Sequence, residues 1–76
     1  MNRDVIFVTG GAGYIGSHIC LQLKKMGKIP VALDLLSTGH RSAVQFGPLV
    51  EVDLCDLENL ILAFQKYNPS AVIHAA

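Results

Sequence analysis

A glycine-rich segment constrains the fold of this chain more than any other part of the sequence. Residues 5–8 before it are continuously apolar and mostly β-branched or aromatic, which is typical of a buried strand in a parallel sheet. Residues 9–16 read TGGAGYIG, and apolar residues then recur every three or four positions up to Met26, before Gly27. This order predicts a strand, a tight glycine turn and an amphipathic helix.

The spacing of the glycines fits a phosphate-binding turn. Gly11, Gly13 and Gly16 satisfy the pattern GxGxxG, and Gly10 with the last two satisfies GxxGxxG. In such a turn one glycine permits the tight bend, another lets the backbone approach a pyrophosphate, and a third lets the helix pack closely against the strand. The anion then meets backbone N–H groups and the positive end of the helix.

An acidic residue stands where a dinucleotide-binding unit needs one. A second strand fits residues 31–33, with Pro30 tolerated at its start, and Asp34 stands at its exit, about 20 residues after the glycine turn. A carboxylate there can accept hydrogen bonds from adenosine ribose hydroxyls and repels a 2′-phosphate, so we expect NAD rather than NADP. The alternative is that Asp34 is only a turn residue.

The rest of the chain continues the alternation of strands and helices. Apolar and acidic residues alternate over 49–54, which predicts a third strand, and Asp56 is a candidate cap for a following helix. The apolar face expected for that helix is Leu57, Leu60, Ile61 and Phe64. A last strand fits residues 71–75, a loop fits residues 37–41, and one short helical turn is expected between there and Pro48.

These elements predict an α/β chain of the Rossmann type. We expect a three-layer fold with a partial parallel sheet in the order 3-2-1-4 and helices on both faces. Residues 1–76 would form the N-terminal part of such a domain, with no second domain. Because 51% of so short a chain is hydrophobic, we expect it to be a piece of something larger.

Charge and composition argue against several partners. Six basic and six acidic side chains give a net charge of zero, so nothing recruits nucleic acid by charge. The apolar runs are too interrupted for a membrane span, and the first residues lack a signal peptide's apolar stretch and cleavage site. We therefore expect a cytoplasmic chain without a metal site, in which Cys20 and Cys55 are ordinary thiols in or near the core.

Two other ligand classes share parts of the pattern. A Walker loop needs Gly-Lys-Ser/Thr at the end of the glycine run, but Ser17 and His18 follow Gly16, so an ATPase is excluded. A methyltransferase can also have glycines after its first strand and an acid after its second, and it remains a minor alternative by fold analogy.

The chain resembles the extended short-chain dehydrogenase/reductase family, and within it the sugar-nucleotide epimerases. Residues 9–18, TGGAGYIGSH, are similar to the opening motif, and residues 33–41, LDLLSTGHR, are similar to the epimerase pattern LDNLSTGHR. Residues 52–54 and 72–76 also match, so the resemblance covers the whole chain. Leu35 departs from it, because the family usually has Asn there, and we expect weaker binding of an unchanged cofactor.

The resemblance implies that NAD lies along the carboxyl ends of the strands. The implied contacts are Gly10, Gly11, Gly13, Tyr14, Ile15, Gly16, Asp34, Leu35, Ser37, Thr38, Gly39, Asp53, Leu54, Ala75 and Ala76. Tyr14 and Ile15 would line the pyrophosphate turn, residues 34–39 the ribose side, and residues 53–54 the adenine pocket. The last two alanines would begin the wall beside the nicotinamide, and His74 is expected only as a hydrogen-bonded strand residue.

The family's catalytic groups are a Ser and a Tyr-x-x-x-Lys pair, and these 76 residues hold no such pair. Tyr14 is followed four positions later by His18, and Tyr67 by Ala71. The resemblance therefore implies an NAD-binding fragment of an enzyme that epimerises a UDP-sugar through a 4-keto intermediate, with the sugar bound only in a longer parent.

Two alternatives remain open for the parent protein. The chain would be a fragment of another NAD-dependent sugar-nucleotide dehydratase or decarboxylase, or a stand-alone dinucleotide-binding module without catalysis. Because the chain stops as the fourth strand ends, that strand would be an open edge of an apolar parallel sheet, which predicts self-association.

Overall fold

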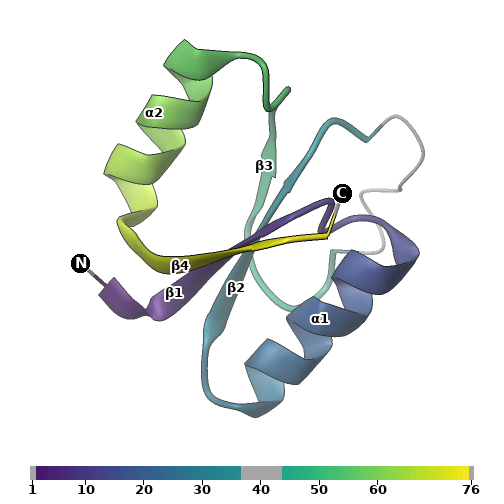
Figure 1. Ribbon diagram of the computed structural model, residues 1–76. Coiled ribbons are helices and arrows are strands. Elements are labelled where there is room, and N and C mark those ends of the chain that lie inside the picture. The colour runs from purple at the N-terminus through teal and green to yellow at the C-terminus, as the bar shows by residue number, and fades with distance from the viewer. Residues whose placement is uncertain (1, 37–43, 76) are drawn as a thin grey trace.

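The computed structural model describes residues 2–36 and 44–75, which form a four-stranded sheet between two helices (Figure 1). In chain order the elements are β1 (Asn2–Thr9), α1 (Tyr14–Lys25), β2 (Ile29–Asp34), β3 (Leu49–Glu51), α2 (Leu57–Tyr67) and β4 (Pro69–His74). The strands lie in the order β3-β2-β1-β4, and every neighbouring pair is parallel. The predicted Rossmann-type α/β fold and its strand order are confirmed.

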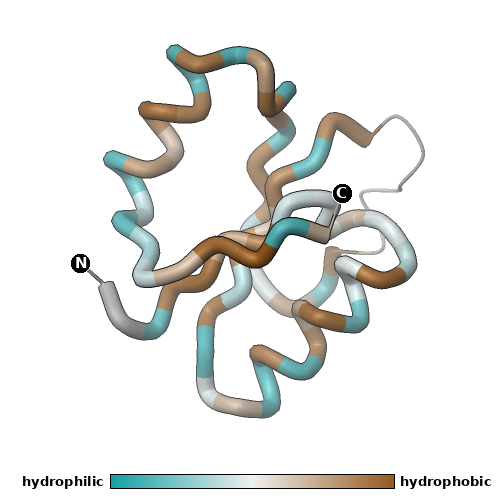
Figure 2. The backbone as a smooth tube through the Cα atoms, viewed as in Figure 1, coloured by the Kyte–Doolittle hydropathy of each residue, from teal (hydrophilic) through white to brown (hydrophobic). Residues whose placement is uncertain are grey.

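The central strands β1 and β2 are buried on both faces. Successive side chains of a strand point to opposite faces, so β1 contributes to a cluster under each helix. The cluster under α2 contains Val5, Phe7, Val31, Leu33, Val52 and Ala63. The cluster under α1 contains Ile6, Val8, Cys20 and Leu23. This double burial explains the continuously apolar sequence of the two strands. In Figure 2, brown hydrophobic segments lie where the strands cross the middle of the fold.

The third strand is shorter than predicted, because it ends at Glu51 rather than at Leu54. Asp53 interrupts it: its carboxylate accepts a hydrogen bond from the N–H of Cys55 at 2.9 Å, and its carbonyl accepts one from the N–H of Asp56 at 2.8 Å. Asp side chains favour turns by binding the backbone two residues on. The alternating pattern therefore continues past the point where the chain turns towards α2.

The buried face of α2 differs from the predicted one. Leu57 and Ile61 are 66% and 46% exposed, whereas Ala63 faces the sheet and is buried. The small side chain of Ala63 leaves room for Phe7 of β1, whose ring meets that of Phe64 edge-on with 4.9 Å between centroids. Leu60 is partly buried, as predicted, together with Tyr67.

The start of α2 and the ends of both helices have recognisable capping residues. The Asp56 carboxylate accepts a hydrogen bond from the N–H of Asn59 at 3.3 Å, which confirms it as the cap of α2. Gly27, with φ +80°, follows the end of α1, and Asn68, with φ +45°, ends α2. Within residues 2–36 and 44–75 neither helix is long and apolar enough to cross a membrane.

The segment before β3 contains no helical turn in its described part, residues 44–48, where the chain bends at Phe46 and Gly47. Gly47 lies so close to the carbonyl of Pro30 that a Cβ there would overlap it, and this packing favours a bend over a helix. The predicted loop 37–41 and residues 42–43 lie outside the described residues.

The two cysteines have different environments. Cys20 is buried under α1, as expected, and this burial raises the pKa of its thiol. Cys55 is exposed in the turn after β3, so its predicted place in or near the core is wrong. The turn that Asp53 starts carries Cys55 out of the sheet.

Candidate dinucleotide-binding site

The glycine turn joins the end of β1 to the start of α1 and is tied to β2. Gly10 has φ +68°, a left-handed conformation that glycine adopts without strain. Its N–H donates to the carbonyl of Leu33 at 2.8 Å, and its own carbonyl accepts the N–H of Gly13 at 3.0 Å. These bonds hold the turn against the carboxyl end of β2.

Two further glycines are required by the packing of the protein itself. A Cβ on Gly11 would lie 2.9 Å from the Cα of Ala32 and 3.0 Å from the carbonyl oxygen of Val8. A Cβ on Gly16 would overlap the carbonyl oxygen of Gly10 and lie 2.8 Å from the Cα of Gly11. Glycine at these positions lets β1, β2 and the first turn of α1 meet closely.

Gly13 has no such packing reason to be glycine. Its φ of −80° and ψ of 176° suit any residue, and a Cβ would meet only the carbonyl oxygen of Gly10, at 3.3 Å. It is the cap residue of α1 and supplies no side-chain hydrogen bond, and the first turn of α1 contains no acidic residue. The N–H groups of residues 14–16 therefore begin α1 without a side-chain cap, at the positive end of the helix dipole.

Asp34 lies beside this turn, at the exit of β2. Its Oδ2 accepts a hydrogen bond from the N–H of Ala12 at 2.9 Å, and its Oδ1 accepts one from the N–H of Leu36 at 2.8 Å. The side chain is half-buried. The structure therefore brings Asp34 and the glycine turn together. Leu35, which follows Asp34, is 54% exposed.

The end of β3 flanks Asp34 on one side. The N–H of Val52 donates to the carbonyl of Asp34 at 3.1 Å, so Asp53 and Leu54 follow directly at the same edge of the sheet. Asp53 is exposed and Leu54 is 38% exposed. An acidic and an aliphatic side chain are thus accessible next to the second strand.

The end of β4 flanks the turn on the other side. The buried Thr9 hydroxyl accepts a hydrogen bond from the N–H of Ala75 at 3.1 Å and lies 2.6 Å from Nδ1 of His74. The Thr9 carbonyl accepts the same Ala75 N–H at 3.1 Å. Ala75 is therefore fixed beside the start of the glycine turn, and His74 is a hydrogen-bonded strand residue, as expected.

The side chains of Tyr14 and Ile15 point away from the turn. They are 81% and 65% exposed, and the Tyr14 ring meets the His18 ring edge-on at 4.7 Å. With these neighbours they line an open hollow of about 470 Å³ on α1. The expected contacts Ser37, Thr38, Gly39 and Ala76 lie outside the described residues.

Sequence reasoning missed two residues that shape the site. Ala12 contributes its main-chain N–H to Asp34, and main-chain groups leave no signal in a sequence pattern. Thr9 binds the backbone of β4, and a polar residue at the end of an otherwise apolar strand was the available signal.

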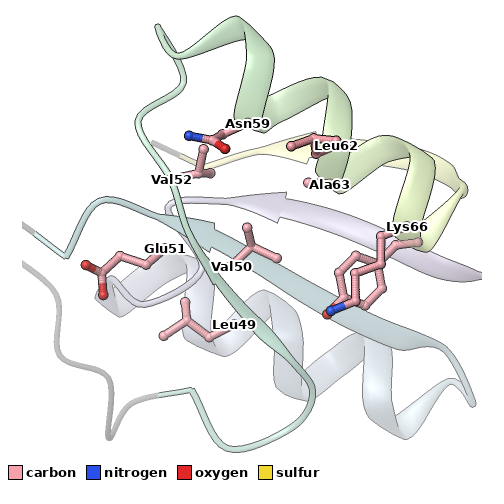
Figure 3. Close-up of a pocket in the computed structure, with 9 residues that line it drawn as sticks. Leu49, Val50, Glu51, Val52, Asn59, Leu62, Ala63 and Lys66 are labelled. Carbon is pink, nitrogen blue, oxygen red and sulfur yellow. The ribbon is translucent and has the colours of Figure 1, made fainter.

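A second open hollow, of about 420 Å³, lies between β3 and α2 (Figure 3). Val50 of β3 and Leu62 and Ala63 of α2 line it, with Glu51 and Lys66 at its margins. It contains no residue of the glycine turn and not Asp34, so it is separate from the candidate site.

Residues 6–76 match the family described as the NAD dependent epimerase/dehydratase family. The UDP-glucose 4-epimerase of Rhizobium leguminosarum bv. trifolii is 45% identical over 76 residues, which are 100% of this chain and 23% of that protein. The Homo sapiens UDP-glucose 4-epimerase is 36% identical over 90 residues, covering 96% of this chain and 25% of that protein. The chain thus spans about a quarter of the length of these relatives.

Solved structures of UDP-glucose 4-epimerases have the same fold over this length. The Brucella ovis enzyme in complex with NAD is 49% identical with a TM-score of 0.94, covering 96% of this chain and 22% of that one. The Thermus thermophilus enzyme in complex with NAD is 44% identical with a TM-score of 0.90, covering 95% of this chain and 24% of that one. This chain belongs to the NAD-dependent epimerase/dehydratase family.

Proposed function

We propose that this chain binds NAD along the carboxyl edge of its sheet, as the cofactor-binding N-terminal segment of an enzyme that interconverts UDP-glucose and UDP-galactose through a 4-keto intermediate. The observation that carries the proposal is the 2.9 Å hydrogen bond between the Asp34 carboxylate and the Ala12 N–H. This bond keeps a carboxylate that would bind the ribose directly beside a glycine turn at a helix N-terminus. The NAD complexes of the Brucella ovis and Thermus thermophilus relatives support the same cofactor.

The pyrophosphate would lie over the turn at Gly13. This residue is free of close packing apart from the Gly10 carbonyl, so the space that a Cβ would fill is available to a ligand. The uncapped first turn of α1, formed by Tyr14, Ile15 and Gly16, offers its N–H groups and the positive end of its dipole, and no acidic residue there opposes an anion.

The adenosine would lie between β2 and β3. Asp34 would accept hydrogen bonds from the ribose hydroxyls, with residues 35–39 beside it, and Asp53 with Leu54 would border the adenine. No basic residue directly follows Asp34, so its negative charge would repel a 2′-phosphate and favour NAD over NADP. Ala75 and Ala76 would begin the wall on the nicotinamide side.

The role of this chain in the reaction is to hold and orient the cofactor. NAD, when bound, supplies the reversible oxidation of a sugar alcohol to a ketone. The Gly10 N–H bonds to β2 and the Ala75 N–H bonds to β1, and these hydrogen bonds hold both sides of the glycine turn in place before NAD binds. The Ser and the Tyr-x-x-x-Lys pair that would move protons are not among these 76 residues, and a UDP-sugar would bind only in the longer parent. Two free cysteines are consistent with a cytoplasmic location.

We also propose that the chain self-associates through the edge of β4, with a second copy as the partner. β4 is an outer strand of the described sheet, and its Ala71 and Val72 are exposed. Leu57 and Ile61 of α2 are exposed as well. An open, apolar strand edge presents unpaired backbone groups to a second chain.

Calorimetric titration of the chain with NAD, and separately with NADP, tests the proposed function. We expect NAD to bind more tightly, and Asp34→Ala to weaken NAD binding about tenfold or more, because hydrogen bonds to a charged group are lost. Asp4→Ala is the matched control, because it removes the same charge from an exposed position near the other end of β1. No heat with either cofactor from a folded chain would contradict the proposal.

A further inference from the structure

We infer that Asp34 also has a positioning role: it holds the glycine turn in its binding shape before a ligand arrives. Both carboxylate oxygens already accept backbone hydrogen bonds, Oδ2 from Ala12 and Oδ1 from Leu36. Ala12 and Asp34 are 22 positions apart, so the first bond joins two separate segments. The consequence for ligand binding rests on the proposed function, whereas the anchoring itself does not.

The Ala12 N–H needs this acceptor. Ala12 is only 3% exposed and lies in the middle of the turn, where the neighbouring bonds are those of the Gly10 and Gly13 N–H groups. A buried N–H without an acceptor is unfavourable, and a charged acceptor forms a stronger hydrogen bond than a neutral one. Removal of the Asp34 carboxylate would therefore leave a buried N–H without an acceptor, and we expect the turn to change its conformation in response.

The second bond controls how the chain leaves β2. Leu36 has φ +64°, a left-handed conformation that is unfavourable for a leucine. The carboxylate of an Asp two residues earlier stabilises such a turn by accepting the N–H, as Oδ1 of Asp34 does at 2.8 Å. One carboxylate thus connects the glycine turn to the exit of β2.

The two roles of Asp34 are compatible. Each carboxylate oxygen has two lone pairs, and each here uses one of them for a backbone N–H. One acceptor site on each oxygen remains for the two hydroxyls of an adenosine ribose. The anchoring bonds therefore orient the carboxylate for the ribose, and a substitution that alters cofactor choice at this position would also loosen the turn.

Amide hydrogen exchange in the ligand-free chain tests the anchor. In Asp34→Ala we expect exchange at Ala12 and Leu36 to accelerate about tenfold or more, since a hydrogen bond to a charged group is lost at each. In Asp4→Ala, which removes the same charge from an exposed position near the start of β1, both amides should keep their original rates. Unchanged exchange at Ala12 in a folded Asp34→Ala chain would overturn the inference.

Asp34→Asn provides a second test of the anchor in case Asp34→Ala does not fold. The amide side chain keeps one oxygen and has an NH2 group in place of the other, so one of the two backbone N–H groups would face a donor instead of an acceptor. We expect one of the two amides, Ala12 or Leu36, to keep its protection while the other loses it. Original protection at both positions would overturn the proposed anchor.

A second titration separates anchoring from ribose recognition. The probes are NAD and an analogue that lacks the 2′- and 3′-hydroxyls of the adenosine ribose. If Asp34 also positions the turn, Asp34→Ala should weaken binding of the dideoxy analogue severalfold. Equal affinity of wild type and Asp34→Ala for that analogue would limit Asp34 to ribose recognition. Failure of the wild type to bind NAD would contradict the proposed function, while hydrogen exchange would still decide the anchor.

Discussion

Alanine at Gly16 should destabilise the chain although it favours the helix. A Cβ at this position would overlap the carbonyl oxygen of Gly10 and lie 2.7 Å from its carbonyl carbon, and these backbone atoms cannot rotate away. Overpacking costs about 1–3 kcal/mol, occasionally more, and the helix propensity of alanine over glycine returns about 1 kcal/mol. Because the overlap is with backbone on two sides, we expect Gly16→Ala to lower the free energy of unfolding by about 2 kcal/mol.

Alanine at Gly13 should leave the stability of the chain almost unchanged but weaken NAD binding. Its Cβ would meet only the Gly10 carbonyl oxygen at 3.3 Å, and its φ of −80° is allowed for alanine. The poorer capping by alanine, about 1 kcal/mol or less, is offset by the loss of about 0.4–1 kcal/mol of unfolded-chain freedom. We therefore expect stability to change by less than about 0.5 kcal/mol, while the added methyl group lowers NAD affinity about tenfold or more.

Urea unfolding followed by circular dichroism, with NAD titration of each folded variant, measures both quantities. The two glycines belong to one turn, so each variant serves as the control for the other. A Gly16→Ala chain as stable as the wild type would refute the packing argument. A Gly13→Ala chain that binds NAD normally would refute the position assigned to the pyrophosphate.

Three further perturbations concern particular side chains. Burial raises the pKa of the Cys20 thiol, so the free energy of unfolding should be fully retained below the ordinary thiol pKa and should fall as the pH rises above it. Urea unfolding at several pH values should show this fall in the wild type and not in Cys20→Ala. Val72→Lys should reduce self-association in sedimentation, because a charge protects an open edge, and a compact wild-type monomer at high concentration would rule the association out. Leu35→Asn should tighten NAD binding about two- to tenfold by adding a hydrogen bond, and unchanged affinity would show that the amide makes no contact.

Strand order was predictable from this sequence, but the length of β3 and the rotation of α2 were not. Two buried strands that are joined by an amphipathic helix can be placed in a sheet in only a few ways, because crossovers between parallel strands are right-handed. The end of β3 coincides with two local hydrogen bonds, from the Cys55 N–H to the Asp53 carboxylate and from the Asp56 N–H to the Asp53 carbonyl, which compete with the strand pattern. In α2, apolar residues including the exposed Leu62 cover more than one face, so periodicity alone does not select the buried one.

The candidate site was predictable where side chains carry it and not where the backbone does. The separation of Asp34 from the glycine turn indicated that the two would meet, because strands of a parallel sheet end at one edge. The bond that joins them comes from the main-chain N–H of Ala12, which any residue except proline could supply. The outward direction of the Tyr14 side chain likewise follows from how α1 packs, which a motif does not specify.

The most direct test of the central claim is a nuclear magnetic resonance titration of the isotopically labelled chain with NAD, following each backbone amide. The account predicts that the largest shifts occur at residues 12–16, Asp34 and Asp53, while amides on the outer side of α2 stay unchanged. Shifts centred on the hollow between β3 and α2, or no shifts in a folded chain, would contradict it.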